Sequence, residues 1–270
     1  MSKRFLVLAP LLCAVPLAAT AEGSPEATAV AAPQAPVIPD WSVTVGAGAL
    51  AVPAYPGASS TRVLPLPYLD IRYRDLFFLN PVAGVGINAI STRRLQLGVS
   101  VLPDLGRSAS SGDQLRGWGD VGAGANLRVF GRYTLGPISI LADARRQLGA
   151  GNGTLVDGGV TRTFLLSRHL ILIPTATLTW ANARYMNAYF GVDGNQSAIA
   201  GSQGQALPTY APGAGLRDAA LMLLAIVPLD DRWSVQSIVR AEVLLGDAAS
   251  SPITQQRIQP MFGGFLGYQL

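Results

Sequence analysis

The stretch "RWSVQSIVRAEVLL", residues 232–245, alternates between two kinds of side chain. One row holds Trp233, Val235, Val239, Ala241 and Val243, and the opposite row holds Gln236, Arg240 and Glu242. A period of two is typical of a β-strand whose two faces meet different surroundings. Because burying an unpaired charge is costly, Arg240 and Glu242 indicate that the polar row faces water.

The same period recurs along most of the chain. It predicts eleven strands, at 41–51, 61–74, 76–90, 94–103, 118–134, 137–149, 153–166, 169–184, 214–229, 232–245 and 256–270. Short turn signals such as "YRDL" and "LDDR" alternate with longer polar stretches at 103–117, 185–213 and 246–256. Short turns at one end and long loops at the other are typical of an up-and-down transmembrane β-barrel.

Two soluble folds share this alternation, a β-sandwich and a lipocalin-like barrel, because both bury one face of each strand and wet the other. Many of the predicted strands run 10 to 14 residues, which is long enough to cross a bilayer at a tilt. Aromatic residues gather near strand ends, as in the interfacial girdles of membrane barrels. Both observations favour the membrane barrel.

The strand number follows from a parity rule, because bacterial single-chain barrels have an even number of strands. Pro81 interrupts the segment 76–90, and Gly84 and Gly86 weaken it. Two short strands there would give twelve, and a partly inserted segment would give ten. We therefore expect an all-β fold, an antiparallel up-and-down transmembrane barrel of about 12 strands.

The first forty residues differ from the rest. Lys3 and Arg4 precede an apolar run over 5–19 and the small residues Ala19-Thr20-Ala21, a pattern that predicts a signal peptide over 1–21. A retained anchor helix is the alternative. Residues 22–40 are rich in Ala and Pro and predict a flexible periplasmic tail before the barrel at 41–270. Export places the barrel in the outer membrane of a Gram-negative cell, among its lipids and lipopolysaccharide.

Composition excludes several classes of site. The chain is 49% hydrophobic and 13% charged, and without Lys3 and Arg4 it has 18 basic and 16 acidic residues. This balance gives no clustered basic face for nucleic acid. The one cysteine, Cys13, lies in the predicted signal peptide, so the mature chain has no thiol for a disulfide, a metal or a nucleophile.

Catalytic signals are weak. His169 is the one histidine and lies beside the short turn in "LLSRHLIL", which favours a turn residue over a catalytic base. There is no Gly-x-Ser-x-Gly elbow, and Asp230-Asp231 fits a tight turn. We therefore expect no catalytic residues, metal or cofactor, and we expect that the protein is not an enzyme.

Two groups of residues remain as candidates for function. Seven charges share the predicted lumen-facing rows: Asp70, Arg72, Arg128, Asp143, Arg145, Arg240 and Glu242. They fit a selective pore lining or a ladder that closes the lumen, and the sequence leaves both open. Four residues are surface-loop candidates: Tyr189, Phe190 and Asp193 in the longest loop, 185–213, and Asp247 in another. A loop of that length is more often functional than idle, and it either plugs the lumen or faces a partner.

Several motifs occur together in a specific order: "YPG" at 55–57, "PLPYLDIRYRDLFFLNPVAGVGIN" at 65–88, "RGWGDV" at 116–121, "AYFGV" at 188–192, "ALPTYAPGAGLRD" at 206–218, "DDRWSV" at 230–235, "LLGDAASSPI" at 244–253 and "FGGFLGYQL" at 262–270. Together they resemble the MipA/OmpV family of outer-membrane proteins, the MltA-interacting proteins. The resemblance covers essentially all of 41–270.

This resemblance implies a non-enzymatic scaffold that connects a murein hydrolase, a lytic transglycosylase, to a murein synthase. Other members are similar to adhesins or envelope-stress proteins. The implied contacts would use the tail 22–40 and turns such as Arg93-Arg94, Arg168-His169 and Asp230-Asp231. A narrow small-solute channel or a surface adhesin is the alternative function, and an outer-membrane enzyme comes third.

Overall fold

The structure is a computed structural model that describes residues 40–104, 106, 121–149, 151–202 and 207–270. The predicted signal peptide and the tail up to residue 39 lie outside these residues. The strands are β1 (Trp41–Pro53), β2 (Thr61–Tyr73), β3 (Phe77–Asn80), β4 (Gly84–Ser91), β5 (Leu95–Asp104), β6 (Gly124–Leu135), β7 (Ile138–Leu148), β8 (Thr154–Arg162), β9 (Phe164–Ser167), β10 (Leu170–Ala181), β11 (Gly215–Pro228), β12 (Trp233–Leu244) and β13 (Ile258–Gln269).

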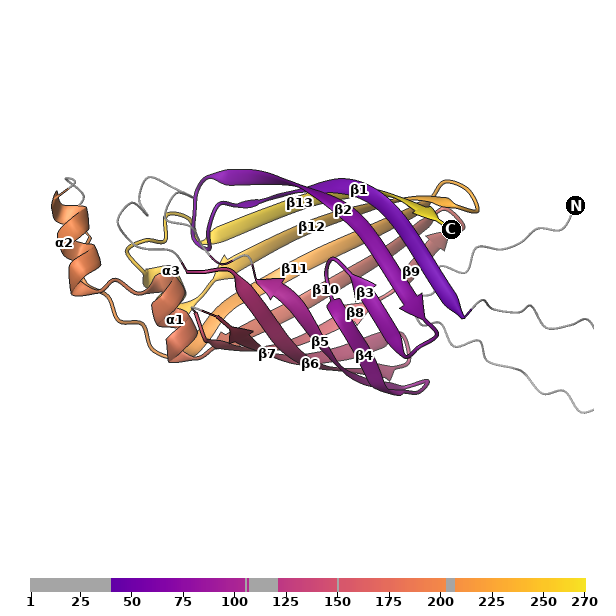
Figure 1. The fold of residues 1–270 in the computed structure, drawn as a ribbon, viewed down its shortest axis with the longest axis horizontal. Coiled ribbons are helices and arrows are strands. Elements are labelled where there is room, and N and C mark those ends of the chain that lie inside the picture. Colours follow the sequence, from indigo (N-terminus) through magenta and orange to yellow (C-terminus); the bar gives the residue numbers. More distant parts are fainter. Residues whose placement is uncertain (1–39, 105, 107–120, 150, 203–206) are drawn as a thin grey trace, which may run out of the picture.

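The strands form one closed antiparallel barrel (Figure 1). Neighbours in the sequence pair around the wall, β13 pairs with β1, and β10 pairs with both β8 and β11. The short strand β9 follows β8 and pairs with the start of β10, so β8 and β9 share one position in the wall. The barrel therefore has 12 strand positions, as the parity argument predicted.

The suspect segment 76–90 is two short strands, which confirms the preferred prediction. Pro81 lies in the turn between β3 and β4, where the ladder needs no N–H from it. Gly84 begins β4 with φ +75, and a Cβ there would lie 2.1 Å from the carbonyl oxygen of Val101. Only glycine fits a left-handed conformation this close to the next strand.

The outward rows of the barrel are apolar and exposed. Val129 is 56% exposed at the middle of β6, Leu221 on β11 is 68% exposed, and Phe262 on β13 is 53% exposed. At the end with the short turns, Trp41 packs on Tyr73 with ring centroids 4.7 Å apart, and Trp233 packs on Tyr268 at 4.9 Å. An apolar band bordered by aromatic pairs is the surface of a barrel in a bilayer.

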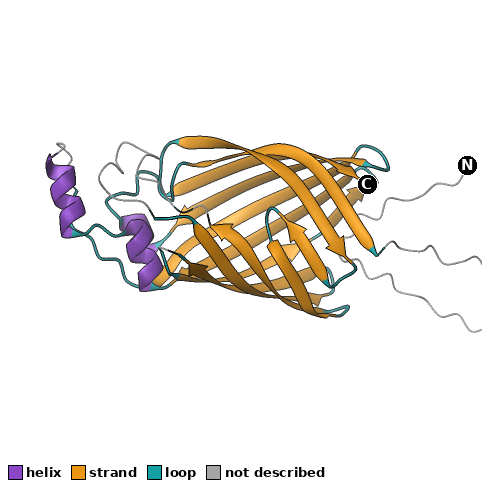
Figure 2. Ribbon diagram, in the orientation of Figure 1, coloured by secondary structure: helices purple, strands orange, loops and turns teal. Residues whose placement is uncertain are grey.

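The helices of the described residues lie at the opposite end of the barrel from the C-terminus (Figure 2). They are α1 (Ala183–Phe190), α2 (Gly194–Ser202) and α3 (Gly246–Ser250). Among the described residues, no helix is long and apolar enough to cross a membrane. The helices belong to the long loops, which mark the extracellular end of the barrel, so the short turns lie on the periplasmic side.

The strand predicted over 169–184 ends at Ala181, three residues earlier than expected. The side chain of Asn182 accepts a hydrogen bond from Tyr185 N and caps α1. The alternation in the sequence could not show this end, because an N-cap residue competes locally with the strand ladder.

The wall is incomplete on one side of β2. Strand β3 pairs only with Ile71–Tyr73, at the periplasmic end of β2. Residues 61–70 of β2 pair with β1 but have no strand partner on the other side among the described residues. In Figure 1, β2 separates from the β3–β4 hairpin above the tip of that hairpin.

The exterior band predicts a depth-dependent cost of charge. Val129→Arg places a guanidinium at the middle of a lipid-facing row and should lower the free energy of unfolding by about 2–4 kcal/mol. Leu135→Arg, at the periplasmic end of the same strand, is the matched control and should cost at most about 1 kcal/mol. Denaturant unfolding of protein in lipid vesicles measures both. Equal costs at the two positions would contradict a bilayer around β6.

Candidate functional site

A chain of ion pairs crosses the lumen-facing side of β6, β7 and β8. Arg128 on β6 contacts Asp143 on β7 at 2.7 Å, and Arg145 contacts the same carboxylate at 3.4 Å. Arg145 also pairs with Asp157 on β8. These side chains are between 14% and 30% exposed, so the pairs are partly shielded from water.

The chain continues across β10, β11 and β12. The Thr179 hydroxyl lies 2.7 Å from an Asp157 carboxylate oxygen and 3.1 Å from one of Asp218, and so bridges β8 to β11. Arg217 pairs with Asp218 and contacts Glu242 at 3.3 Å. Arg240 contacts Glu242 at 2.8 Å. We call the eight charged residues Arg128, Asp143, Arg145, Asp157, Arg217, Asp218, Arg240 and Glu242, with Thr179, the ion-pair belt.

A β-bulge makes the centre of the belt possible. The register between β10 and β11 shifts, so that Thr179 opposes Asp218 while Trp180 opposes Leu216. Arg217 is the extra residue, and the bulge lets two neighbouring side chains, Arg217 and Asp218, both point inward. The Asp218 side chain is fully buried and that of Arg217 is 12% exposed, so each needs a charge partner, and each is the nearest one to the other.

The charges of the belt are balanced. Four arginines meet four carboxylates, and every one of them forms an ion pair with a neighbour. A paired, neutral row creates little net field for selecting ions, because each charge is compensated within a few ångströms. Of the two interpretations that the sequence left open, this pairing favours the ladder.

Two of the seven predicted lumen charges lie outside the belt. Asp70 and Arg72 pair with each other on β2 at 2.9 Å. Their inward orientation follows from Tyr68 in the same row, whose hydroxyl bonds Gln236 on β12, a strand that is not adjacent to β2. The other five, Arg128, Asp143, Arg145, Arg240 and Glu242, are brought together in the belt.

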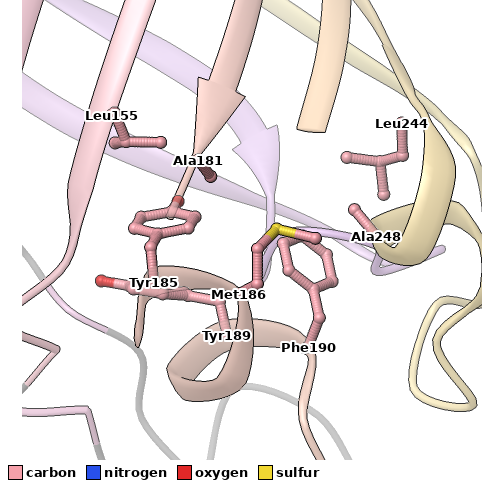
Figure 3. Packing of buried hydrophobic residues seen from close by; sticks show 8 residues of the cluster. All are labelled: Leu155, Ala181, Tyr185, Met186, Tyr189, Phe190, Leu244 and Ala248. Atoms are coloured by element: carbon pink, nitrogen blue, oxygen red, sulfur yellow. The ribbon is translucent and has the colours of Figure 1, made fainter. Parts of the chain in front are cut away.

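Helix α1 packs onto the extracellular end of the barrel through an apolar cluster (Figure 3). Its side chains Met186 and Phe190 are fully buried, and Tyr185 and Tyr189 stack with ring centroids 4.5 Å apart. The cluster also includes the strand-end residues Leu155, Ala181 and Leu244, and Ala248 of α3. The helix is therefore fastened to β8, β10 and β12 at once.

The tyrosines of α1 connect this cluster to the lumen. The Tyr185 hydroxyl accepts a hydrogen bond from Arg217 of the belt at 2.8 Å, and burial raises the pKa of this phenol. The Tyr189 hydroxyl accepts one from the Gln147 side chain on β7 at 3.0 Å. The apolar cluster and the belt thus form one continuous interior.

A second buried cluster joins the other extracellular loops. It contains Ala54, Tyr55 and Ala58 from the β1–β2 loop with Val192 and Ile253. Asp247 accepts a hydrogen bond from Gly213 N at 2.7 Å, and its carbonyl accepts one from Tyr210 at 3.0 Å. We call α1, α3 and these loops, residues 54–60, 183–192 and 246–253, the cap.

The surface-loop candidates lie at different positions in and beside the cap. Asp193 and Asp247 are exposed, and Asp193 caps α2 through reciprocal bonds with Gln196 at 2.8 Å. Tyr189 and Phe190 are 5% and 0% exposed and lie inside the cap rather than at the membrane interface or the cell surface. Their aromatic side chains form the apolar face of an amphipathic helix. The polar residues that follow them in the sequence favoured an exposed loop instead.

No arrangement for catalysis emerges in the described part of the chain. His169 is exposed in the β9–β10 turn, and its backbone N–H donates to Ser167 Oγ at 3.1 Å. Asp230 accepts backbone hydrogen bonds from Trp233 and Arg232, which lower its pKa. The described ranges hold no group of three His, Cys, Asp or Glu residues that could bind a metal ion.

Sequence reasoning missed four members of the belt: Asp157, Thr179, Arg217 and Asp218. Asp157 shares its row with Leu155 and Gly159, so the polarity of that row is weak. Arg217 and Asp218 are neighbours, and a strict period of two allows only one of them to face inward. The adjacent opposite charges of Arg217 and Asp218 were the one available signal in the sequence that a bulge interrupts this strand.

The family comparison agrees with the fold. The family model described as "MltA-interacting protein MipA" matches residues 45–270, which includes most of β1 and all of the later strands. The chain belongs to the MipA family. A search of curated proteins finds no match to this MipA family member.

Solved structures similar to this MipA family member are distant in sequence. A KdgM porin is 8% identical, with a TM-score of 0.40, over 83% of this chain and 98% of the porin. The outer membrane channel DcaP of Acinetobacter baumannii is 9% identical, with a TM-score of 0.40, over 85% and 96% of the two chains. A bacterial polysaccharide outer membrane secretin is 7% identical, with a TM-score of 0.43, over 84% and 98%.

The belt predicts a large cost for removing its central arginine. Arg217→Met leaves the fully buried Asp218 carboxylate without its nearest partner and should lower the free energy of unfolding by about 3–5 kcal/mol. Arg72→Met is the control, because the Arg72 side chain is 46% exposed, and should cost less than about 1 kcal/mol. Denaturant unfolding in vesicles measures both, and equal costs would argue against a belt that depends on Arg217.

The cap predicts a local effect for Phe190. Phe190→Ala leaves a cavity in the buried cluster at a cost of about 3–5 kcal/mol, so the cap should open more often. Protease added to the extracellular side should cleave the 182–214 loop at least about tenfold faster. Ile199→Ala on α2, where the side chain is 40% exposed, is the control and should leave the rate unchanged. An unchanged rate in Phe190→Ala would show that the cluster does not hold the cap.

Proposed function

We propose that this MipA family member is a non-catalytic outer-membrane scaffold whose periplasmic face binds a murein hydrolase of the MltA kind and, through it, a murein synthase. The family description carries this proposal, because it names an interaction with MltA rather than a reaction. A scaffold function needs an anchored body and an accessible periplasmic surface, and the barrel supplies both.

The interior of the barrel supports a scaffold over a channel. The cap packs two buried clusters over the extracellular end, and the belt crosses six of the twelve wall positions below it. A conducting pore needs a hydrated path from one side to the other. Cap and belt together place apolar and paired side chains along that path. The adhesin alternative has one supporting observation, since α2 projects away from the barrel (Figure 1).

The periplasmic rim offers charge for a partner. Arg93 and Arg94 in the β4–β5 turn and Arg168 in the β9–β10 turn are exposed, and none has a side-chain ion pair within the described ranges. By contrast, the exposed Arg74 is already paired with Asp40 at 2.8 Å. We call Arg93, Arg94 and Arg168 the rim arginines. Exposed charges of one sign steer association with an oppositely charged surface.

The proposal predicts that the rim arginines matter for binding. The triple variant Arg93→Glu, Arg94→Glu and Arg168→Glu should weaken binding of purified MltA to the barrel in lipid vesicles by at least about tenfold, because attraction becomes repulsion. Arg184→Glu with Arg257→Glu, at exposed extracellular positions, is the matched control and should bind as the unaltered protein does. Biolayer interferometry measures both.

Two outcomes would contradict the proposal. If MltA does not bind the unaltered barrel, the scaffold role is wrong for this chain. If the rim variant and the extracellular control weaken binding equally, the partner does not use the periplasmic rim.

A further inference from the structure

The hydrogen bonds between β1 and β2 show which backbone groups of β2 point to its free side, the side away from β1. At the two ends of the β1–β2 ladder, Ala54 N donates to Ser60 O at 2.9 Å and Arg74 N donates to Asp40 O at 2.7 Å. The register is continuous between these ends, so the even-numbered residues of β2 bond β1. The backbone groups of its odd-numbered residues therefore point away from β1, toward the side where 61–70 lack a described partner.

Two prolines occupy this free side. Pro65 and Pro67 are odd-numbered, so their missing N–H groups fall where the ladder has no partner strand. Between residues 61 and 69, these prolines leave only Thr61, Val63 and Leu69 with backbone N–H groups that point away from β1. Because prolines cannot donate to a ladder, they are favoured where a strand has no partner on their N–H side. The sequence of β2 thus specifies an edge within the wall of a closed barrel.

The tip of the β3–β4 hairpin is suited to lipid rather than water. Its turn residues are Pro81, Val82 and Ala83, with Val82 72% exposed, whereas the periplasmic turns carry charges. The Asn80 side chain accepts hydrogen bonds from the backbone N–H groups of Val82 at 3.0 Å and Ala83 at 2.6 Å. A turn in hydrocarbon must satisfy its donors internally. The tip, and the unpaired edge of β2 beside it, therefore lie within the bilayer.

Behind this edge, part of the inner surface of the barrel is apolar. Leu64 and Leu66 of β2 lie on the inward row with Arg62 and Tyr68, and they pair with Leu50 and Gly48 of β1. A Cβ on Gly263 would meet Leu50 and Ile238 at 2.2 and 2.8 Å, and one on Gly48 would meet Phe265 at 2.3 Å, so these side chains share the inner surface. We call Leu50, Leu64, Leu66, Ile238 and Phe265 the inner apolar patch.

One cation lies at the extracellular end of this patch. Arg62 is on the same inward row of β2, about 13 Å along the strand from Leu66. Its Nε atom is buried and has no hydrogen-bond partner among the described residues. A buried donor without a partner is costly, and an anionic oxygen would satisfy it with a charge-assisted bond.

We propose that the unpaired edge of β2 borders a lateral binding site for an anionic lipid of the surrounding bilayer, with an acyl chain passing between β2 and the β3–β4 hairpin onto the inner apolar patch and the anionic head group on Arg62. The lipid follows from the location, because hydrocarbon is what meets an edge within the membrane. The head-group charge follows from Arg62, which lies at the outer end of β2 where a head group would be.

The test uses the barrel in bilayers that contain phosphatidylglycerol with a diazirine midway along one acyl chain. On illumination the carbene inserts into side chains that the chain touches, and mass spectrometry locates the sites. Lipid-facing residues such as Val63 react with the probe whether or not a lipid enters the barrel. Lateral entry predicts additional insertion at the inward residues Leu64 and Leu66. Phosphatidylcholine with the same chain should label these two at least about fivefold less, since its head group has no net charge.

Arg62→Gln should reduce insertion at Leu64 and Leu66 from the phosphatidylglycerol probe by at least about fivefold, and Arg62→Lys should largely retain it. Arg132→Gln is the matched control, because Arg132 is an inward-facing arginine on β6 that forms no ion pair among the described residues. This variant should label as the unaltered protein does. The heat-induced shift in gel mobility checks that each variant is folded.

Labelling of Val63 without Leu64 or Leu66 would overturn lateral entry. Equal labelling in Arg62→Gln and Arg132→Gln would overturn the role of Arg62.

Discussion

Every backbone N–H and C=O group inside hydrocarbon needs a partner, and the rest of this structure depends on that constraint. It closes the sheet, because β13 pairs with β1 over Thr44 to Ala51 and so removes the free edges of the first and last strands. It also sets strand length and leaves the side chains free to divide between lipid and lumen. The alternation in 232–245 is the visible result, with apolar residues outside and Gln236, Arg240 and Glu242 inside.

The interior solves a different problem, since a barrel of this size must either fill its lumen or hydrate it. At the level of the belt it is filled by long charged side chains that compensate one another around β6 to β12. Toward the cell surface, tyrosines connect this polar layer to an apolar cluster that packs like the core of a soluble protein. The two layers make the extracellular half one folded unit, which fits a body that anchors rather than transports.

Much of this architecture was predictable because the period of two survives in nearly every strand. The twelve positions followed from alternation, parity and Pro81, and most strand ends fell within one or two residues of those expected. Local competition hid the rest. Asn182 turned the end of a strand into a helix start, the bulge at Arg217 broke the alternation, and Tyr189 and Phe190 proved to face inward from a short helix. Each depends on a contact made after folding.

The short β3–β4 hairpin also gives the barrel two hydrophobic heights. Most of the wall is built from strands of 9 to 14 residues, whereas β3 has four and β4 has eight. Lipids beside the low section meet a shorter apolar surface, and a bilayer adapts to such mismatch by thinning locally or by letting the protein tilt. The barrel should therefore deform its membrane on one side only, which gives it a preferred direction in the plane of the bilayer and a preferred side for its lateral neighbours.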